Sequence, residues 1–292
     1  MKKVLKTLFV LLLFPFALLG QTKGIVVDEN NNPIPFVNIW IENGDNGTTS
    51  EQNGTFVIDV TPEKKLIFSV LGYQKKTCKA TEVQKVVLQE ATFQLNEVVI
   101  VKTKNTKQLE IGNNKDSFYQ AFENGPRIDL KFFPYLTTYS KTKYIKFITL
   151  NADTRIENTT IKLHLFSVDT NGYPDQELNK KDILTTLSKG VNKSKIDITD
   201  LHIKMPQNGI FVSFEKLMIA NNKIEKINTD SDKNKSKGQT TFSPFVLYNY
   251  VEKDFSFLFK GGKWIKQQDE TFQNTKTKIM IYEPAINLIL TN

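Results

Sequence analysis

Short runs of alternating apolar and polar residues, separated by turn residues, dominate the chain from residue 22 onwards. Residues 36–41 and 160–166 show the pattern most clearly, because each carries apolar side chains at every second position, the period of a strand with one buried face. Asn53-Gly54 between two such runs is a hairpin signal. Long apolar runs with helical spacing are absent, and residues 116–122 hold at most one or two helical turns. Further strands are predicted at residues 24–27, 55–58, 66–70, 86–88, 95–101, 143–150, 196–198, 210–214, 255–259 and 278–282.

A polar, charged stretch without periodicity divides these strands into two groups. It covers residues 102–109 and predicts a linker. The strands before it, in residues 21–101, have the spacing of a β-sandwich. The strands after it, in residues 110–292, predict a second β-sandwich, so we expect an all-β protein of two sandwich domains.

The first twenty residues have the pattern of a secretory signal peptide. Lys2, Lys3 and Lys6 precede an apolar run that starts at Leu8 and is too short to span a bilayer as a helix. We expect cleavage after Gly20; an uncleaved N-terminal anchor is the alternative. The next residue is Gln21 and not a cysteine, so lipid attachment there is not expected. The prediction is an exported mature chain without a transmembrane segment, located in the periplasm, at the outer membrane or outside the cell.

Charge and cysteine content change this picture little. The formal net charge is +8, but nearly all the cations are lysines and the only arginines are Arg127 and Arg155. Proteins recognise phosphates and base edges best with arginine, whose guanidinium group makes paired hydrogen bonds to them. Because arginine is rare in this chain, no nucleic-acid partner is predicted. Cys78 is the only cysteine, which rules out an intramolecular disulfide. We expect a buried or half-buried, unreactive thiol.

Glycines, turn residues and apolar positions recur in a fixed order in the first domain, in residues 24–28, 32–39, 47–50, 53–56, 66–73 and 95–100. In these residues the domain resembles the carboxypeptidase-regulatory-like (CarboxypepD_reg-like) domain, a transthyretin-like β-sandwich. In Bacteroidetes such domains often precede the plug and barrel of SusC-type TonB-dependent receptors. The resemblance implies a scaffold whose hallmark residues perform no chemistry. The chain after residue 101 lacks the many long alternating strands that a barrel requires, so neither plug nor barrel is expected.

The second domain is similar to the tail of a smaller group of secreted two-domain proteins from Bacteroidetes. This similarity implies a jelly-roll-like sandwich and no transferable activity. It is carried by residues 144–147, 163–169, 197–201 and 208–215.

Known catalytic and metal-binding patterns are missing from the sequence. The two histidines, His164 and His202, belong to no zinc-ligand motif, and both are expected to lie at the surface or half-buried. No serine-hydrolase elbow or phosphate-binding glycine loop occurs. We therefore predict no catalytic residue, no cofactor and no metal. Paired carboxylates drawn from Asp197, Asp200 and Glu215 are the one arrangement that could support a glycan hydrolase.

Aromatic side chains are the best candidates for ligand contact. Trp40 and Trp264 could form stacking platforms for sugar rings, although either could instead belong to a core or to the seam between the domains. Weaker candidates are Tyr135, Tyr139, Tyr248 and Tyr250.

Three functions are compatible with the sequence. The first is a non-catalytic exported binding or adaptor protein, whose partner is a polysaccharide or a protein of the cell envelope. The second is a glycan-acting hydrolase with its site in the second domain. The third is a purely structural envelope module that docks a partner.

Overall fold

The structure is a computed structural model that describes residues 21–91, 106–112, 128–228, 237–253, 255–267 and 279–292. The predicted signal peptide, the predicted strand at residues 95–101 and the helical turns at 116–122 lie outside these residues. The described residues form β-strands and four short 3-10 segments, so the prediction of an all-β protein is confirmed. Among them, no helix is both long and apolar enough to cross a bilayer. The 3-10 segments are η1 (Ala80–Glu82), η2 (Thr137–Lys141), η3 (Thr199–Leu201) and η4 (Ala220–Asn222).

The first domain consists of a three-stranded and a four-stranded sheet that enclose one core. In the smaller sheet β1 pairs antiparallel with β4 and parallel with β7. The inner faces meet through apolar side chains such as Val26, Ile39 and Phe68, all fully buried. The sheets have the strand orders β4 (Thr55–Asp59), β1 (Gln21–Val27), β7 (Lys85–Val87) and β3 (Gly47–Thr49), β2 (Asn38–Ile41), β5 (Lys65–Ser69), β6 (Lys76–Lys79).

The second domain also consists of two facing sheets. The five-stranded sheet has the order β14 (Gly190–Asp197), β10 (Tyr144–Thr154), β23 (Ile286–Thr291), β8 (Gln108–Ile111), with β18 (Phe245–Val246) paired to β10. The seven-stranded sheet has the order β12 (Pro174–Glu177), β11 (Thr159–Val168), β15 (Ile210–Lys216), β9 (Ile128–Phe133), β20 (Ser256–Lys260), β21 (Lys263–Gln267), with β13 (Ile183–Leu187) paired to β11. Two ribbons complete the domain, β16 (Lys223–Asn228) with β17 (Lys237–Phe242) and β19 (Tyr248–Lys253) with β22 (Ile279–Pro284).

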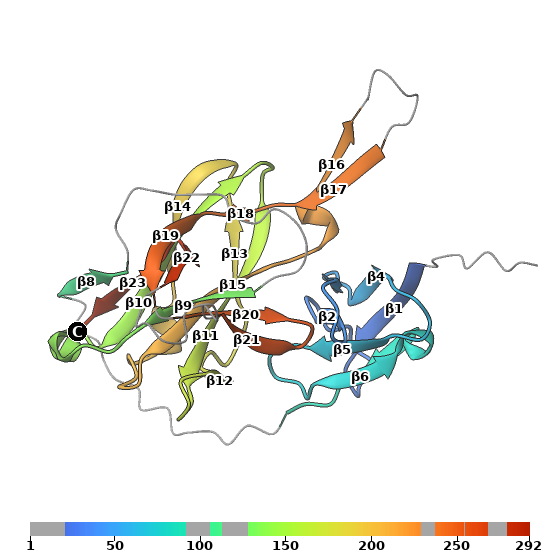
Figure 1. The fold of residues 1–292 in the computed structure, drawn as a ribbon. Coiled ribbons are helices and arrows are strands. Elements are labelled where there is room, and N and C mark those ends of the chain that lie inside the picture. Colours follow the sequence, from blue (N-terminus) through green and yellow to red (C-terminus); the bar gives the residue numbers. More distant parts are fainter. Residues whose placement is uncertain (1–20, 92–105, 113–127, 229–236, 254, 268–278) are drawn as a thin grey trace, which may run out of the picture.

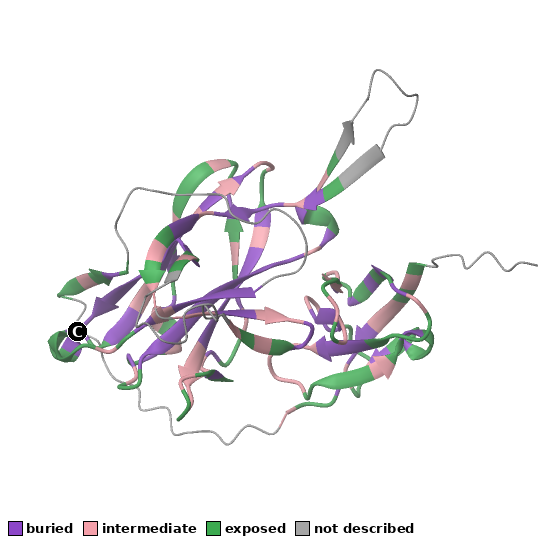
Figure 2. Ribbon diagram, viewed as in Figure 1, coloured by how far each residue is buried: buried purple, intermediate pink, exposed green. Residues whose placement is uncertain are grey.

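The core of the second domain follows the predicted alternation. Ile161, Leu163 and Leu165 of β11 are fully buried between the two sheets. The stretch expected as a linker, residues 102–109, reaches into β8, whose Gln108 and Leu109 pair with β23. The edge strand β14 is mostly exposed, whereas every residue of β15 is buried (Figure 2). Both faces of β15 are therefore covered, one by the opposing sheet and the other by further structure.

Part of that covering comes from the first domain. Figure 1 shows the β20–β21 hairpin reaching from the second domain to β2 and β5 of the first. At this seam the Lys75 ammonium donates to the carbonyl of Gly262 at 2.7 Å, and the backbone N–H of Ala220 donates to the Glu51 carboxylate at 2.8 Å. The outer face of the four-stranded sheet thus packs against the outer face of the seven-stranded sheet.

Candidate functional site

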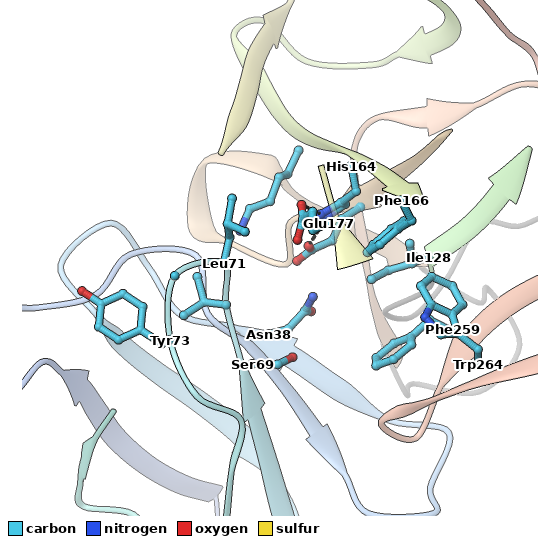
Figure 3. Close-up of a pocket in the computed structure, with 14 residues that line it drawn as sticks. Asn38, Ser69, Leu71, Tyr73, Ile128, His164, Phe166, Glu177, Phe259 and Trp264 are labelled. Atoms are coloured by element: carbon cyan, nitrogen blue, oxygen red, sulfur yellow. Dashed lines mark hydrogen bonds and ion pairs between the residues drawn. The ribbon is translucent and has the colours of Figure 1, made fainter. Parts of the chain in front are cut away.

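A cavity of about 270 Å³ lies between the two domains. Figure 3 shows it as a gap between β2 and β5 of the first domain and β11 of the second. Its walls combine polar side chains from both domains with a cluster of aromatic rings. The lining residues are Asn38, Ser69, Val70, Leu71, Gly72 and Tyr73 from the first domain, and Ile128, Lys162, His164, Phe166, Glu177, Glu215, Phe259 and Trp264 from the second.

Strand alternation places these side chains on the seam. On β11, Ile161, Leu163 and Leu165 face the core, so Lys162, His164 and Phe166 face outward. On β2, Ile39 faces the core of the first domain, so Asn38 and Trp40 face the second domain. Asn38 pairs with Ser69 of β5 across the sheet, so these two polar residues are neighbours on one wall.

The centre of the opposite wall is an ion-paired histidine. His164 Nδ1 lies 2.7 Å from Glu177 Oε1, and its Nε2 lies 2.8 Å from Glu215 Oε2. Burial alone would lower the pKa of His164, but the charges and hydrogen bonds of the two carboxylates outweigh it and raise the pKa to about 9. The same imidazolium holds the pKa of Glu177 below its ordinary value, against the opposite effect of burial. At neutral pH, His164 is thus a cation that donates both ring N–H groups to carboxylates.

His164 therefore differs from the sequence-based expectation. The prediction of a surface or half-buried histidine is wrong, because the residue is only 7% exposed. The alternation in residues 160–166 places His164 on the strand face opposite Leu163 and Leu165, and in the structure the first domain covers that face. The other histidine, His202, is exposed and adopts a left-handed conformation after η3.

A buried lysine joins the two domains beside this histidine. The Lys162 side chain is 2% exposed, and its Nζ donates to the carbonyl oxygen of Phe36 at 2.9 Å. It also lies 3.5 Å from Asp182 Oδ2. Because a buried ammonium needs partners, Lys162 favours the docked arrangement of the domains.

The wall formed by the first domain carries polar groups without partners. Asn38 is 8% exposed, and its side-chain amide has no hydrogen-bond partner among the described residues. Figure 3 shows this side chain pointing into the cavity. The amide atoms are not among the fully buried side-chain atoms that lack a partner, so they are accessible from the cavity. The amide can therefore hydrogen-bond to a water molecule or to a ligand.

Aromatic rings form the third wall. Trp264 packs edge-on against Phe166, with ring centroids 5.3 Å apart, and against Phe259 at 4.9 Å. Phe259 also contacts Trp40 at 5.7 Å. One side of the cavity is therefore an apolar surface of aromatic rings, which lies next to the charged and polar walls.

The two tryptophans predicted to contact a ligand lie in different environments. Trp264 is half-buried and lines the cavity. Trp40 is 1% exposed and lies in the seam behind Phe259, so neither of its faces is open to a ligand. A ligand-binding role for either residue stays a prediction.

The weaker tyrosine candidates are not at the cavity. Tyr139 and Tyr248 are buried, and Tyr248 donates its hydroxyl to Asp129 at 2.7 Å. Tyr135 packs on Tyr139, and Tyr250 is exposed on the β19–β22 ribbon.

The three carboxylates considered for hydrolysis do not meet. Asp197 is exposed at the end of β14, in the five-stranded sheet, and Asp200 is exposed in η3, whereas Glu215 lies on β15 of the other sheet. Glu215 is instead committed to His164. In the part of the chain that the structure describes, no group of three or more His, Cys, Asp or Glu side chains is arranged to hold a metal ion. The thiol of Cys78 is half-buried on β6, and burial raises its pKa.

Several site residues could not be selected from the sequence. The alternation on β11 places Lys162 and His164 on one face, but only the structure adds Glu177 and Asn38. Glu177 comes from the edge strand β12 and Asn38 from the other domain. No spacing in the sequence connects them.

Comparison with known proteins identifies the first domain. Residues 22–100 match the CarboxypepD_reg-like domain family. No curated protein matches the chain. Among solved structures, a chain in the structure of infectious bursal disease virus Gx strain shares 9% sequence identity, with a TM-score of 0.24. That match covers 92% of this chain but only 62% of the viral chain, and so low a score does not establish a common fold. Residues 22–100 are therefore similar to the CarboxypepD_reg-like domain, which is a non-catalytic β-sandwich.

Proposed function

We propose that this protein is a non-catalytic binding protein of the cell envelope and that the cavity between its domains binds one residue of an envelope glycan. The proposal includes export through the signal peptide in residues 1–20 and an origin in bacteria of the Bacteroidetes type. The observation that carries it is the lining of this cavity: one wall presents the Asn38 amide, the facing wall holds carboxylates and the third wall is aromatic.

The chemistry of this cavity suits a sugar ring. A pyranose has apolar C–H faces that stack on aromatic rings and hydroxyls at its edge that both donate and accept hydrogen bonds. Trp264 and Phe166 supply the aromatic surface, while Asn38 and Ser69 supply an amide and a hydroxyl. The volume of about 270 Å³ suits one ring and not a longer segment.

The ionic cluster supports binding in preference to hydrolysis. A glycosidase needs one carboxyl group as an acid and the other as a base or nucleophile, with the scissile bond between them. Here an imidazole ring occupies the space between Glu177 and Glu215 and bonds to both. Both carboxylates are therefore engaged in holding His164.

The test is binding of residues 21–292 to a panel of bacterial and plant glycans by calorimetry. Asn38→Ala and Trp264→Ala should each weaken binding about tenfold or more, because each removes a hydrogen bond or a stacking surface worth about 1–2 kcal/mol. Tyr250→Ala is the matched control, since Tyr250 is an exposed aromatic outside the cavity.

Three outcomes would contradict the proposal, and two of them involve an observed activity. One is glycan binding that Tyr250→Ala abolishes and the cavity variants leave intact. The other is glycan hydrolysis that is lost on substitution of one acidic residue, which would support the hydrolase alternative. If no glycan in the panel binds, the protein-docking alternative replaces the glycan proposal.

A further inference from the structure

The charged side chains around the cavity differ in their accessibility to a ligand. The two cations, Lys162 and His164, have side chains only 2% and 8% exposed. Both ring N–H groups of His164 are used by Glu177 and Glu215, and Lys162 binds Phe36 and Asp182. Neither cation is therefore available to bind an anionic ligand.

The accessible charge at the cavity is a carboxylate. The Glu177 side chain is 17% exposed, against 3% for Glu215. Its Oε1 accepts from His164 and from Asn179, whereas Oε2 has no hydrogen-bond partner among the described residues. The cavity thus presents a negatively charged acceptor to a ligand. The charged residues that line the cavity are two carboxylates, Glu177 and Glu215, and two cations, Lys162 and His164, and the most exposed of these side chains is Glu177.

The other walls are compatible with a positive group. The Asn38 amide and the Ser69 hydroxyl can each accept a hydrogen bond. Trp264 and Phe166 form an aromatic surface, whose ring faces attract cations. An ammonium group in the cavity would meet a carboxylate, an amide oxygen and aromatic rings. A carboxylate could accept from the Asn38 amide and the Ser69 hydroxyl, but Glu177 would repel it.

We propose, building on the glycan-binding function above, that the cavity selects its sugar by charge: it binds a residue with a free amino group most tightly, a neutral residue less tightly, and excludes acidic residues. Glu177 is the specificity-determining residue in this proposal, and Asn38 faces it from the other domain.

The experiment uses methyl glycosides of glucose, galactose and mannose, each in four forms: neutral, 2-amino, 2-acetamido and 6-carboxylate. Binding to residues 21–292 is measured by ligand-observed NMR at about pH 6, where a primary amine is protonated. We expect the 2-amino form to bind about fivefold or more tighter than the neutral form. No binding of the 6-carboxylate form is expected.

Two variants test the role of Glu177. Glu177→Gln keeps a carbonyl acceptor for His164 but removes the charge, so the preference for the amino form should disappear. Asn38→Asp adds a charge on the opposite wall and should increase that preference, which keeps the test decisive if Glu177→Gln misfolds. Glu225→Gln is the matched control, because Glu225 is an exposed glutamate paired with Lys223 on the β16–β17 ribbon.

The possible failures are distinguishable. Equal binding of the amino and neutral forms, or tightest binding of the acidic form, would overturn the charge selectivity and leave the glycan site in place. Binding by none of the glycosides, together with a negative glycan panel, would overturn both proposals. An unchanged preference in Glu177→Gln and in Asn38→Asp would show that this cavity is not the source of the selectivity.

Discussion

His164 shows how much a single buried residue can depend on its neighbours. An isolated imidazolium in a protein interior is strongly disfavoured, but two carboxylates at hydrogen-bond distance reverse the balance. Removing one member of such a cluster leaves the others buried without a partner, which costs about 3–5 kcal/mol. The cluster is therefore a constraint on the native state and not a group of independent ion pairs.

The raised pKa of His164 predicts a specific pH dependence of stability. Its pKa is about 9 in the folded protein and near 6.5 when unfolded, so folding favours the protonated form. The resulting contribution, about 3 kcal/mol, is fully present below the unfolded pKa and is lost as the pH rises through about 9. Urea unfolding of the wild type and of His164→Gln should give a difference in stability that is large at about pH 6 and small at about pH 9.5.

The control for this prediction is His202→Gln, since His202 is exposed and outside the cluster. Glu177 affects the stability at low pH, because its pKa is lower in the folded than in the unfolded protein. It contributes stability above its unfolded pKa, and this contribution is lost as the pH falls through its folded pKa. A difference between wild type and His164→Gln that does not change from neutral to alkaline pH would contradict the assignment.

At the scale of elements, the strands of the seam have two buried faces with different chemistry. On β11 one face is aliphatic and belongs to the core, while the other carries Lys162, His164 and Phe166.

On β1, in the first domain, close packing leaves no room for a side chain at Gly24. A Cβ atom added to Gly24 would lie 2.0 Å from the carbonyl oxygen of Val83 and 2.8 Å from the ring of Phe56. This strand therefore tolerates no side chain at position 24.

We predict that Gly24→Ala destabilises the first domain by about 2–3 kcal/mol or more, because the backbone at Val83 must move. Gly72→Ala is the matched control from the same domain. Gly72 has a φ of +90° but no atom within 4 Å of an added Cβ, so only the backbone conformation is penalised, by about 1 kcal/mol. Thermal unfolding of both variants checks the order, and an equal or larger loss in Gly72→Ala would contradict it.

At the scale of the whole molecule, the two domains share one buried seam. Backbone and side-chain groups cross it at several points, including Lys162 to Phe36 and Met218 to Thr49. The cavity exists only because the two sheets are held at this distance. The proposed ligand site therefore depends on the docking of the two domains.

The two tryptophans provide a direct test of the docked arrangement. In Trp264→Phe the remaining Trp40 is 1% exposed, so acrylamide should quench its fluorescence several-fold less than that of Trp264 in Trp40→Phe. Lys162→Met weakens the seam and, combined with Trp264→Phe, should increase the quenching of Trp40. Similar quenching of both tryptophans in the folded chains would show that the seam is open in solution.

Local patterns in the sequence predicted the secondary structure well. Alternation identified the all-β class and the inward face of β11, because a strand with one buried face repeats every second residue. Residues 22–100 could be assigned to a domain family because glycines and apolar positions of its scaffold have a fixed order. The position of Trp264 at a ligand-sized cavity could only be suggested as one alternative.

The sequence by itself determined the strand class and the likeness of the N-terminal residues to one domain family, since these depend on short-range periodicity and turn chemistry. Only the tertiary structure decided that His164 is buried, that Glu177 and Glu215 bind it, and that Asn38 faces them from another domain. The cavity brings together residues far apart in the chain, such as Asn38 and Glu215, which both line it and are separated by 177 positions. Outward strand faces look alike in sequence whether they meet water or another sheet, and domain docking distinguishes the two.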